Sequence, residues 1–309
     1  MLHNVRHRPP FRKRKTKSER LPWEVDMSLC MAAACQEKGE LRIVTWADTR
    51  SEIDWAGANI AHKYDHVAGP HWHSLMAGEL SKGKEIAATY RSVLKPEEFT
   101  EDNIYDKLNE AACVHKEKLT KQLVRKRLAM SYDRFLTKGE KELTSDVRNR
   151  TLYAIEKLEF GADLIVCGFL NGLPHIYFMG GDAEVIRQEN FAAIGTGDVI
   201  AQSLLHYREQ HLAMPLEKTL YHMYEAFLMA YQSKAPGVGD ISQVAVLSPG
   251  SNNTVTVRLG LSSLMRHLDL SFQKYGPKMV GDIPPLPSKC LIEPQAGFKV
   301  VKKKMQGDG

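Results

Sequence analysis

The chain has 309 residues, of which 43% are hydrophobic and 26% are charged, a composition typical of a globular protein. No run of about 18 apolar residues occurs and the N-terminus has no apolar core segment, so we expect neither a membrane-spanning helix nor a secretory signal. The five cysteines are odd in number and scattered, which argues against a disulfide framework or a zinc pair and favours free thiols in the reducing cytoplasm.

The basic charge is concentrated at the N-terminus. Residues 1–20 hold eight Lys/Arg and one Glu, whereas the rest of the chain has a net charge of −2. The basic segment fits a nucleic-acid arm or an import signal, and it also fits a solvated tail or upstream sequence that is absent from the mature protein. The last two readings are the plainer ones. Because residues 1–26 lack apolar periodicity and contain Pro-Pro, we expect them to be a disordered extension, and the charge of the remaining chain argues against a nucleic-acid partner.

The first half of the chain begins with short apolar runs. Residues 28–35 and 41–47, separated by the turn sequence QEKGE, predict a β-hairpin. A polar loop is expected up to about residue 58. Two further strands, 59–66 and 72–77, are separated by Ala-Gly-Pro.

Helical periodicity follows over 80–94, 100–136 and 146–158. Strands are predicted at 162–170, at the segment HIYFMGG and at 189–195, and later at 243–248 and 253–260. Helices are expected at 198–211, 216–232 and 262–274. This order of grouped strands and helices predicts a layered α+β sandwich with antiparallel sheets in one domain, 27–275, followed by a flexible basic tail, 276–309.

Signals for a cofactor or a metal are weak. The sequence has no Gly-rich phosphate loop or HExxH motif in a convincing context, so we expect no cofactor. His66, His71 and His73 lie close together, but no acidic or cysteine ligand has matching spacing. We interpret them as polar histidines at strand ends and expect no metal.

A carboxylate and a lysine follow the first strands. Asp48, Thr49 and Arg50 come directly after the second strand of the hairpin, and Lys63 lies in the next strand run. A lysine in a half-buried strand needs an anionic partner, and Asp48 is the nearest in sequence. The alternative is a simple ion pair that anchors a loop.

Five short motifs occur in the order seen in one known family. They are Met-Ser at 27–28, Ala-Asp-Thr-Arg at the hairpin end, the strand lysine, Met-Ala-Gly at 76–78 and Ile-Gly-Thr-Gly at 194–197. Over about residues 28–248 the chain resembles the proteasome β-subunit branch of the N-terminal nucleophile (Ntn) hydrolases. The resemblance implies a four-layer αββα sandwich with two antiparallel sheets.

The resemblance also implies a catalytic site. In this family the first residue of the mature chain is the nucleophile and its α-amine is the base, which points to Ser28 once Met27 is removed. Residues 1–26 would then be a propeptide or a mis-assigned start, and we favour the latter because Asp26-Met27 lacks the glycine usual before an autolytic cut. Lys63 would lower the pKa of the amine and Asp48 would orient Lys63.

Further roles are implied for residues of the other motifs. Gly78 matches the glycine whose N–H forms the oxyanion hole, and Thr196 matches a hydroxyl residue near the amine. Arg50 matches an arginine with a structural role.

The chain departs from the family pattern in three places. The interval from Ser28 to Asp48 is a few residues long, so we expect an extended hairpin loop. Cys30 shares a strand face with Ser28 and is the rival nucleophile. The family's second Asp is not recognisable, since Asp240 and Ser233 are the candidates and neither is in clear register.

Two functions from different classes remain open. The first is an amide or peptide hydrolase that acts through Ser28, and the second is a catalytically inactive, ring-forming subunit of the same fold. The resemblance implies self-association, possibly in rings, and an ATPase partner by analogy alone.

Overall fold

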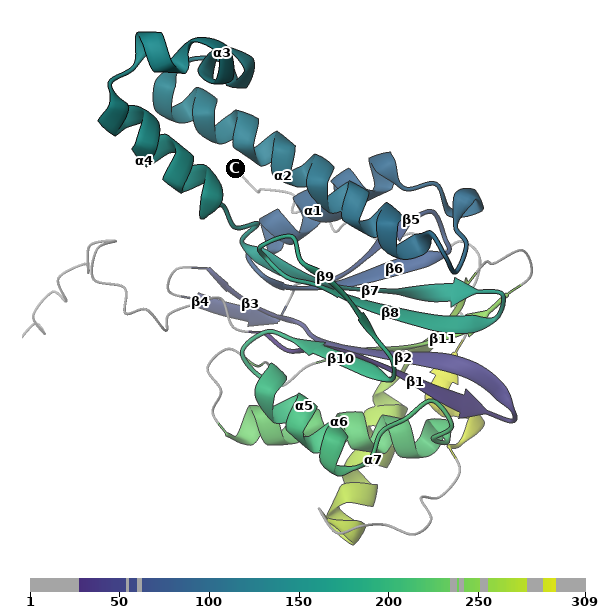
Figure 1. Ribbon diagram of the computed structural model, residues 1–309. Coiled ribbons are helices and arrows are strands. Elements are labelled where there is room, and N and C mark those ends of the chain that lie inside the picture. The colour runs from purple at the N-terminus through teal and green to yellow at the C-terminus, as the bar shows by residue number, and fades with distance from the viewer. Residues whose placement is uncertain are drawn as a thin grey trace, which may run out of the picture.

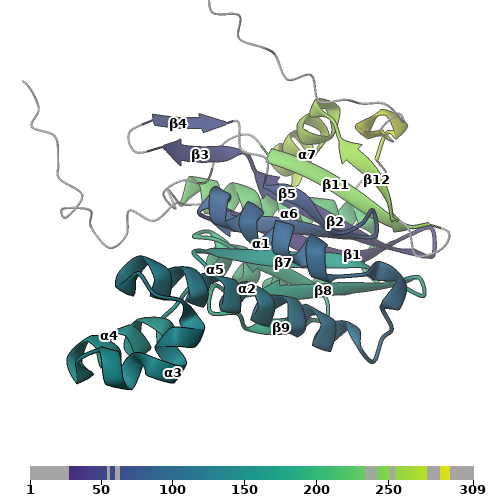
Figure 2. The ribbon, with the colours of Figure 1, turned by 90° about the horizontal axis from the view of Figure 1, so that it is seen from above.

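The computed structural model describes residues 28–53, 56–59, 63–233, 238, 242–250, 255–276 and 286–292. Figures 1 and 2 show two stacked β-sheets with helices on both outer faces. One sheet is covered by α1 (Leu80–Val93) and α2 (Ile104–Leu128), and the other by α5 (Asp198–Tyr207), α6 (Leu216–Gln232) and α7 (Ser262–Tyr275). This arrangement confirms the predicted αββα sandwich.

The first sheet has six strands, and every neighbouring pair is antiparallel. Its order is β10 (Phe191–Ile194), β1 (Cys30–Glu37), β2 (Glu40–Asp48), β11 (Ser242–Pro249), β12 (Val255–Gly260) and β13 (Leu291–Ile292). Strands β1 and β2 are both interior strands, so the first segment of the described chain is flanked on both sides and is fixed in position.

The second sheet has five antiparallel strands in sequence order. They are β5 (Tyr64–Ala68), β6 (Trp72–Gly78), β7 (Ala162–Leu170), β8 (Leu173–Met179) and β9 (Val185–Gln188). A separate two-stranded sheet is formed by β3 (Arg50–Ile53) and β4 (Ala56–Asn59). The prediction of a polar loop up to residue 58 is therefore wrong, because β3 and β4 pair with each other in antiparallel orientation.

Strand β1 shows how the layers are built. Its residues Cys30, Ala32 and Ala34 are buried between the two sheets with Leu75 and Ile165. The alternate residues Leu29, Met31, Ala33 and Cys35 are buried against α5 and α6. Side chains alternate along a strand, so a continuous apolar run is needed where both faces of the sheet are covered.

Two predicted boundaries are corrected by the structure. The helix expected over 100–136 ends at Leu128, because Ala129 adopts a left-handed conformation with φ +51°, and α3 (Tyr132–Glu142) then starts at a cap made by Ser131. Helix α4 (Ser145–Glu156) follows. In the tail expected to be flexible, β13 pairs with β12 and Cys290 is buried in the core, so the domain extends at least to residue 292.

The hairpin between β1 and β2 also differs from expectation. Its turn contains two residues, Lys38 and Gly39, both with positive φ, which is the geometry of a tight type I′ turn. The long interval from Ser28 to Asp48 is taken up by long strands in unbroken register, and the expected extended loop is wrong. None of the described helices has the length and apolar character to span a membrane.

Candidate active site

Ser28 lies two residues before the interior strand β1 and is buried, with 2% of its surface exposed. The registers of β1 pair Cys30 with Ala47 of β2 and with Ile194 of β10. Extended by two residues, these registers would set Ser28 between Thr49 and Thr196. The end of β1 therefore brings together the two segments that the sequence singled out.

A glycine allows the chain to pass close to Ser28. Gly195 has φ +96°, and a Cβ atom built on it would overlap the carbonyl oxygen of Ser28. A Cβ atom on Gly197 would lie 3.1 Å from the Cβ of Ala230 and 3.4 Å from Leu29, which is a tight fit without overlap. These contacts explain the two glycines of the Ile-Gly-Thr-Gly motif, because any side chain at residue 195 would push β10 away from the start of β1.

Asp48 and Lys63 form a buried ion pair, with 0% and 5% of their surfaces exposed. The other carboxylate oxygen of Asp48, Oδ2, accepts the backbone N–H of Leu29 at 3.0 Å. The N–H of Asp48 in turn donates to the carbonyl of Leu29 at 3.0 Å. The sequence prediction that Asp48 is the partner of Lys63 is confirmed, and the pair is held against the residue that follows Ser28.

Lys63 directly precedes β5 of the second sheet, and β6 of that sheet connects it to β1. The carbonyl of Lys63 accepts the N–H of Met76 at 2.9 Å, and the carbonyl of Met76 accepts the Sγ–H of Cys30 at 3.3 Å. Gly78 ends the same strand, β6, with φ +96°, and a Cβ on it would meet the backbone of residues 161 and 162. The Cβ of Ala77 lies beside Gly195, which contacts Ser28. Gly78 directly follows Ala77, so it is close to Ser28 as well.

Cys30, the rival nucleophile, is fully buried between the sheets. Burial raises the pKa of its thiol to about 12, although the charge of Lys63 acts in the opposite direction. The thiolate is the reactive form of cysteine, so this environment disfavours Cys30 as a nucleophile.

The remaining candidates lie in different elements. Thr196 is exposed on the turn between β10 and α5. Arg50 is the first residue of β3. Ser233 is exposed and its hydroxyl donates to the carbonyl of Ala230 at 2.8 Å at the end of α6, whereas Asp240 lies outside the described residues.

The histidine cluster has a packing role. The rings of His66 and His73 are 4.6 Å apart, and Nδ1 of the buried His73 is 2.5 Å from the hydroxyl of Tyr64. Burial lowers the pKa of His73 to about 3. Among the described residues, no group of three His, Cys, Asp or Glu side chains is placed to hold a metal ion.

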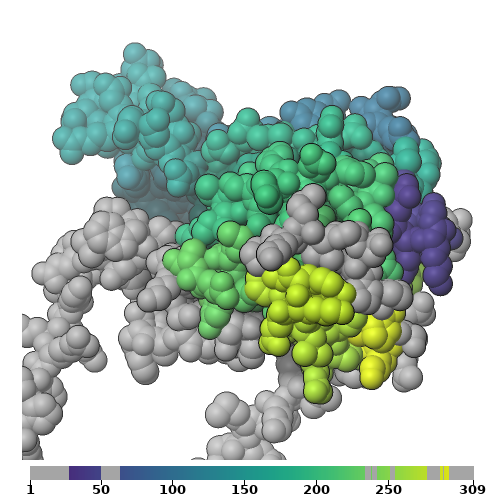
Figure 3. Space-filling model, turned by 90° about the horizontal axis from the view of Figure 1, so that it is seen from below, coloured from purple at the N-terminus to yellow at the C-terminus, as the bar shows by residue number. Residues whose placement is uncertain are grey.

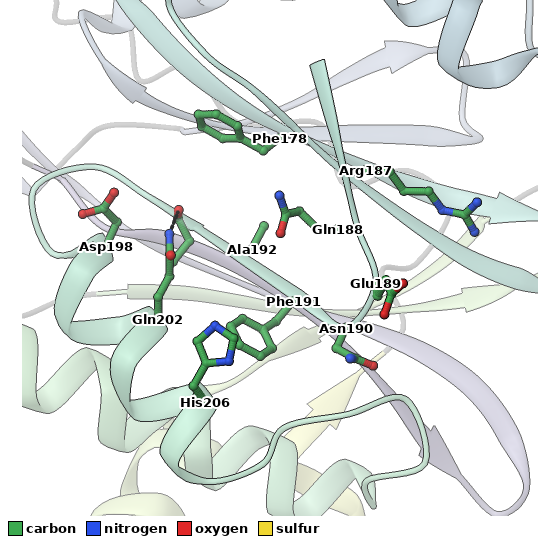
Figure 4. Close-up of a pocket in the computed structure, with 11 residues that line it drawn as sticks. Phe178, Arg187, Gln188, Glu189, Asn190, Phe191, Ala192, Asp198, Gln202 and His206 are labelled. Atoms are coloured by element: carbon green, nitrogen blue, oxygen red, sulfur yellow. Dashed lines mark hydrogen bonds between the residues drawn. The ribbon is translucent and has the colours of Figure 1, made fainter. Parts of the chain in front are cut away.

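A pocket of about 390 Å³ opens where the edge strands β9 and β10 of the two sheets meet one face of α5 (Figure 4). Asp198, Gln202 and His206 line it from one face of α5, and Gln202 donates to the carbonyl of Ala193 at 3.0 Å. Ser28, Asp48, Lys63, Gly78 and Thr196 are not part of its lining. Sequence reasoning missed this pocket, because the spacing of its residues on α5 reads as an ordinary amphipathic helix.

Comparison with known families identifies the class of fold. The family model for proteasome subunits matches residues 117–245. The match supports a proteasome-like fold for this chain. The matched segment includes Thr196 but begins after the strands that hold Ser28, Asp48, Lys63 and Gly78, so those positions rest on the geometry described above. No curated protein matches the chain.

Proposed function

We propose that this proteasome-like protein is an Ntn-type hydrolase of amide or peptide bonds, with Ser28 as its nucleophile in a form of the chain that begins at that residue. The observation that carries the proposal is the buried Lys63–Asp48 pair, whose carboxylate also holds the N–H of Leu29. A pair held against the second residue of the mature chain would lie beside the terminal α-amine.

The proposed reaction begins with proton transfer. The α-amine of Ser28 takes the proton of its own hydroxyl as the oxygen attacks the substrate carbonyl carbon. A free α-amine has a pKa of about 7.7–8.0, and the neighbouring ammonium of Lys63 lowers the pKa and keeps the amine neutral. Asp48 keeps Lys63 in position.

The second half of the reaction releases the products. The N–H of Gly78 stabilises the oxyanion of the tetrahedral intermediate. Collapse of the tetrahedral intermediate breaks the amide bond of the substrate. The leaving amine takes the proton held by the α-amine of Ser28. Water then hydrolyses the ester on Ser28, with the α-amine again acting as the base, and the acid product leaves.

The alternative, an inactive ring-forming subunit, is favoured by one observation. Ser28 is 2% exposed in the chain that carries its preceding residues, and an amide nitrogen at Ser28 is not a base. Both functions include self-association, and we propose a ring as the assembly and the cytoplasm as the location. An ATPase partner is proposed by analogy alone.

The first experiment is intact-mass measurement and N-terminal sequencing of the protein purified from its own host. A chain that begins at Ser28 is expected. A chain that retains residues 1–27 would contradict the hydrolase and favour the inactive subunit.

The second experiment compares variants of the form that begins at Ser28, using fluorogenic peptide amides as substrates. Ser28→Ala should lower kcat/KM at least about a thousandfold, because the nucleophile is lost. Ser28→Thr is the matched control and should retain activity, since it keeps a hydroxyl at the same place. Equal activity of Ser28→Ala and the parent form would overturn the proposal.

A further inference from the structure

A helical arm projects from the sandwich. It consists of residues 121–157, which form the last two turns of α2 with α3 and α4 (Figure 1). Helices α3 and α4 pack on α2 and on each other. Figure 3 shows the arm, in teal, standing out from one side of the molecule. Little of it is therefore buried within the chain described here.

The arm carries apolar side chains that face solvent. Leu136, Leu152 and Tyr153 are 60%, 41% and 62% exposed. An open groove of about 780 Å³ runs between α2 and α4, and Leu123 and Tyr153 form part of its wall. An amphipathic helical hairpin whose apolar residues remain exposed indicates a surface that a partner covers.

The groove is also basic. Arg127, Arg150 and Lys157 line it, together with one carboxylate, Glu159. The whole arm contains ten Lys/Arg and five Asp/Glu. When the arm and residues 1–20 are both left out, the rest of the chain contains 24 Lys/Arg and 31 Asp/Glu. Positive charge is thus separated onto the arm, and the rest of the domain is negative.

The complementary charge is concentrated at the opposite end of α2. Residues 97–110, the acidic end, hold one lysine, Lys107, which pairs with Glu98 and Glu110. They hold six exposed carboxylates: Glu97, Glu98, Glu101, Asp102, Asp106 and Glu110. Exposed apolar side chains lie there as well, since Tyr105 is 46% exposed and Leu173 is 45% exposed. Leu173 is near because Asn171, at the adjoining β7–β8 turn, donates to Glu101 at 3.2 Å.

The two ends cannot neutralise each other within one molecule. At a rise of 1.5 Å per residue, Asp106 and Arg125 are about 28 Å apart along a single rigid helix. That distance is several times the screening length of about 8 Å at physiological salt. The two surfaces are therefore complementary between two copies of the chain. The groove is basic, the end of α2 is acidic, and both carry exposed apolar residues.

The character of the arm favours protein over nucleic acid as the occupant. Arg134 pairs with Glu142, and Arg150 pairs with Asp146, so the arm is a mixed surface rather than a continuous cationic track. Exposed Tyr and Leu among arginines are typical of protein interfaces. Residues 1–20 have a net charge of the same sign as the arm, which argues against them as its occupant.

We propose that the arm groove of one copy docks on the acidic end of α2 in the next copy, so that the contact is head-to-tail. A contact between two different surfaces of the same chain propagates, and it closes into a ring when the rotation permits. The inference rests on the self-association proposed above and specifies the surface that carries it, independently of catalysis at Ser28.

The test is sedimentation analysis of full-length variants, with folding checked by circular dichroism. The arm variant is Arg127→Glu/Lys157→Glu, and the end variant is Glu97→Lys/Asp102→Lys. Each should weaken self-association at least about tenfold, because like charges then meet across the contact. The matched control reverses two exposed cations outside the arm, Lys84→Glu/Arg266→Glu, and should assemble like the wild type.

Mixing the two variants makes the test specific. The reversed arm of one variant is complementary to the reversed end of the other, and both unreversed surfaces also match, so an equimolar mixture should recover assembly. An arm variant that assembles like the wild type, or a mixture that fails to recover, would overturn the proposed surface.

The readout also separates this inference from the proposed function. A wild-type chain that stays monomeric at its highest soluble concentration would contradict self-association itself, and the docking surface with it. An assembling protein without amide hydrolysis would contradict the hydrolase and leave the docking surface standing.

Discussion

Single glycines decide how closely the strands approach at the candidate active site. Gly195 has no room for a side chain, because the carbonyl of Ser28 occupies the place of its Cβ, and its φ of +96° disfavours any other residue. The same φ argument applies to Gly172, at +77°, but there no atom lies within 4 Å of an added Cβ. A side chain at Gly172 would add backbone strain alone, whereas a side chain at Gly195 would add both strain and steric overlap.

We predict that Gly195→Ala lowers the free energy of unfolding by about 3 kcal/mol or more, because strain and overlap add. Gly172→Ala should lower it by about 1 kcal/mol, from the left-handed conformation alone. Urea unfolding of both variants measures the difference. Equal destabilisation would show that the contact with Ser28 is not tight.

The cysteines offer a second test at this scale. Burial raises the pKa of Cys30, Cys35 and Cys167 to about 12, whereas Cys113 is exposed on α2. Under native conditions at neutral pH, iodoacetamide should label Cys113 and leave the three buried thiols unmodified. Peptide mass spectrometry identifies the labelled residue. Rapid labelling of Cys30 would support the alternative in which Cys30 is the nucleophile.

At the scale of elements, the break between α2 and α3 determines the direction of the arm. The helix ends because Ala129 takes the left-handed conformation, in which a Cβ is strained, and the N–H of Ala129 still donates to the carbonyl of Arg125. The Ser131 hydroxyl then accepts the N–H of Arg134 at 3.2 Å and starts α3.

The same substitution should therefore have opposite effects at two alanines. Ala129→Gly should stabilise the protein by about 0.5–1 kcal/mol, since glycine adopts positive φ without strain. Ala154→Gly, inside α4, should destabilise it by about 1 kcal/mol. Thermal unfolding compares them. Destabilisation by Ala129→Gly would mean that the break is not strained.

At the scale of the whole molecule, buried histidines should limit stability in acid. Burial lowers the pKa of His73 to about 3, and it lowers the pKa values of His115 and His222 to about 4. In the unfolded chain a histidine has a pKa of about 6.5. Between these values the unfolded state binds protons that the folded state excludes.

We therefore predict full stability above about pH 6.5 and a decline as the pH falls toward 4, by up to about 1.4 kcal/mol per pH unit for each histidine. Urea unfolding at pH values of about 7.5, 6 and 5 measures the slope. His222→Gln should make the slope shallower. Stability that is unchanged down to pH 5 would contradict the prediction.

The sequence by itself determined the class of fold, the position of most elements and the chemical identity of the Asp48–Lys63 pair. These depend on local patterns, since apolar alternation and capping act over a few residues. It missed the β3–β4 hairpin, whose acidic and glycine-containing segment lacks an apolar face, and the break at Ala129, because alanine favours helix.

The tertiary structure alone decided which distant segments meet. Only the pairing of β1 with both β2 and β10 brings Gly195 against Ser28, and only the stacking of two sheets brings Lys63 to Asp48. The arm and the acidic end are likewise separated by the rigidity of α2, which no short pattern expresses. Such contacts arise from packing between elements far apart in the chain, where local preference carries no information.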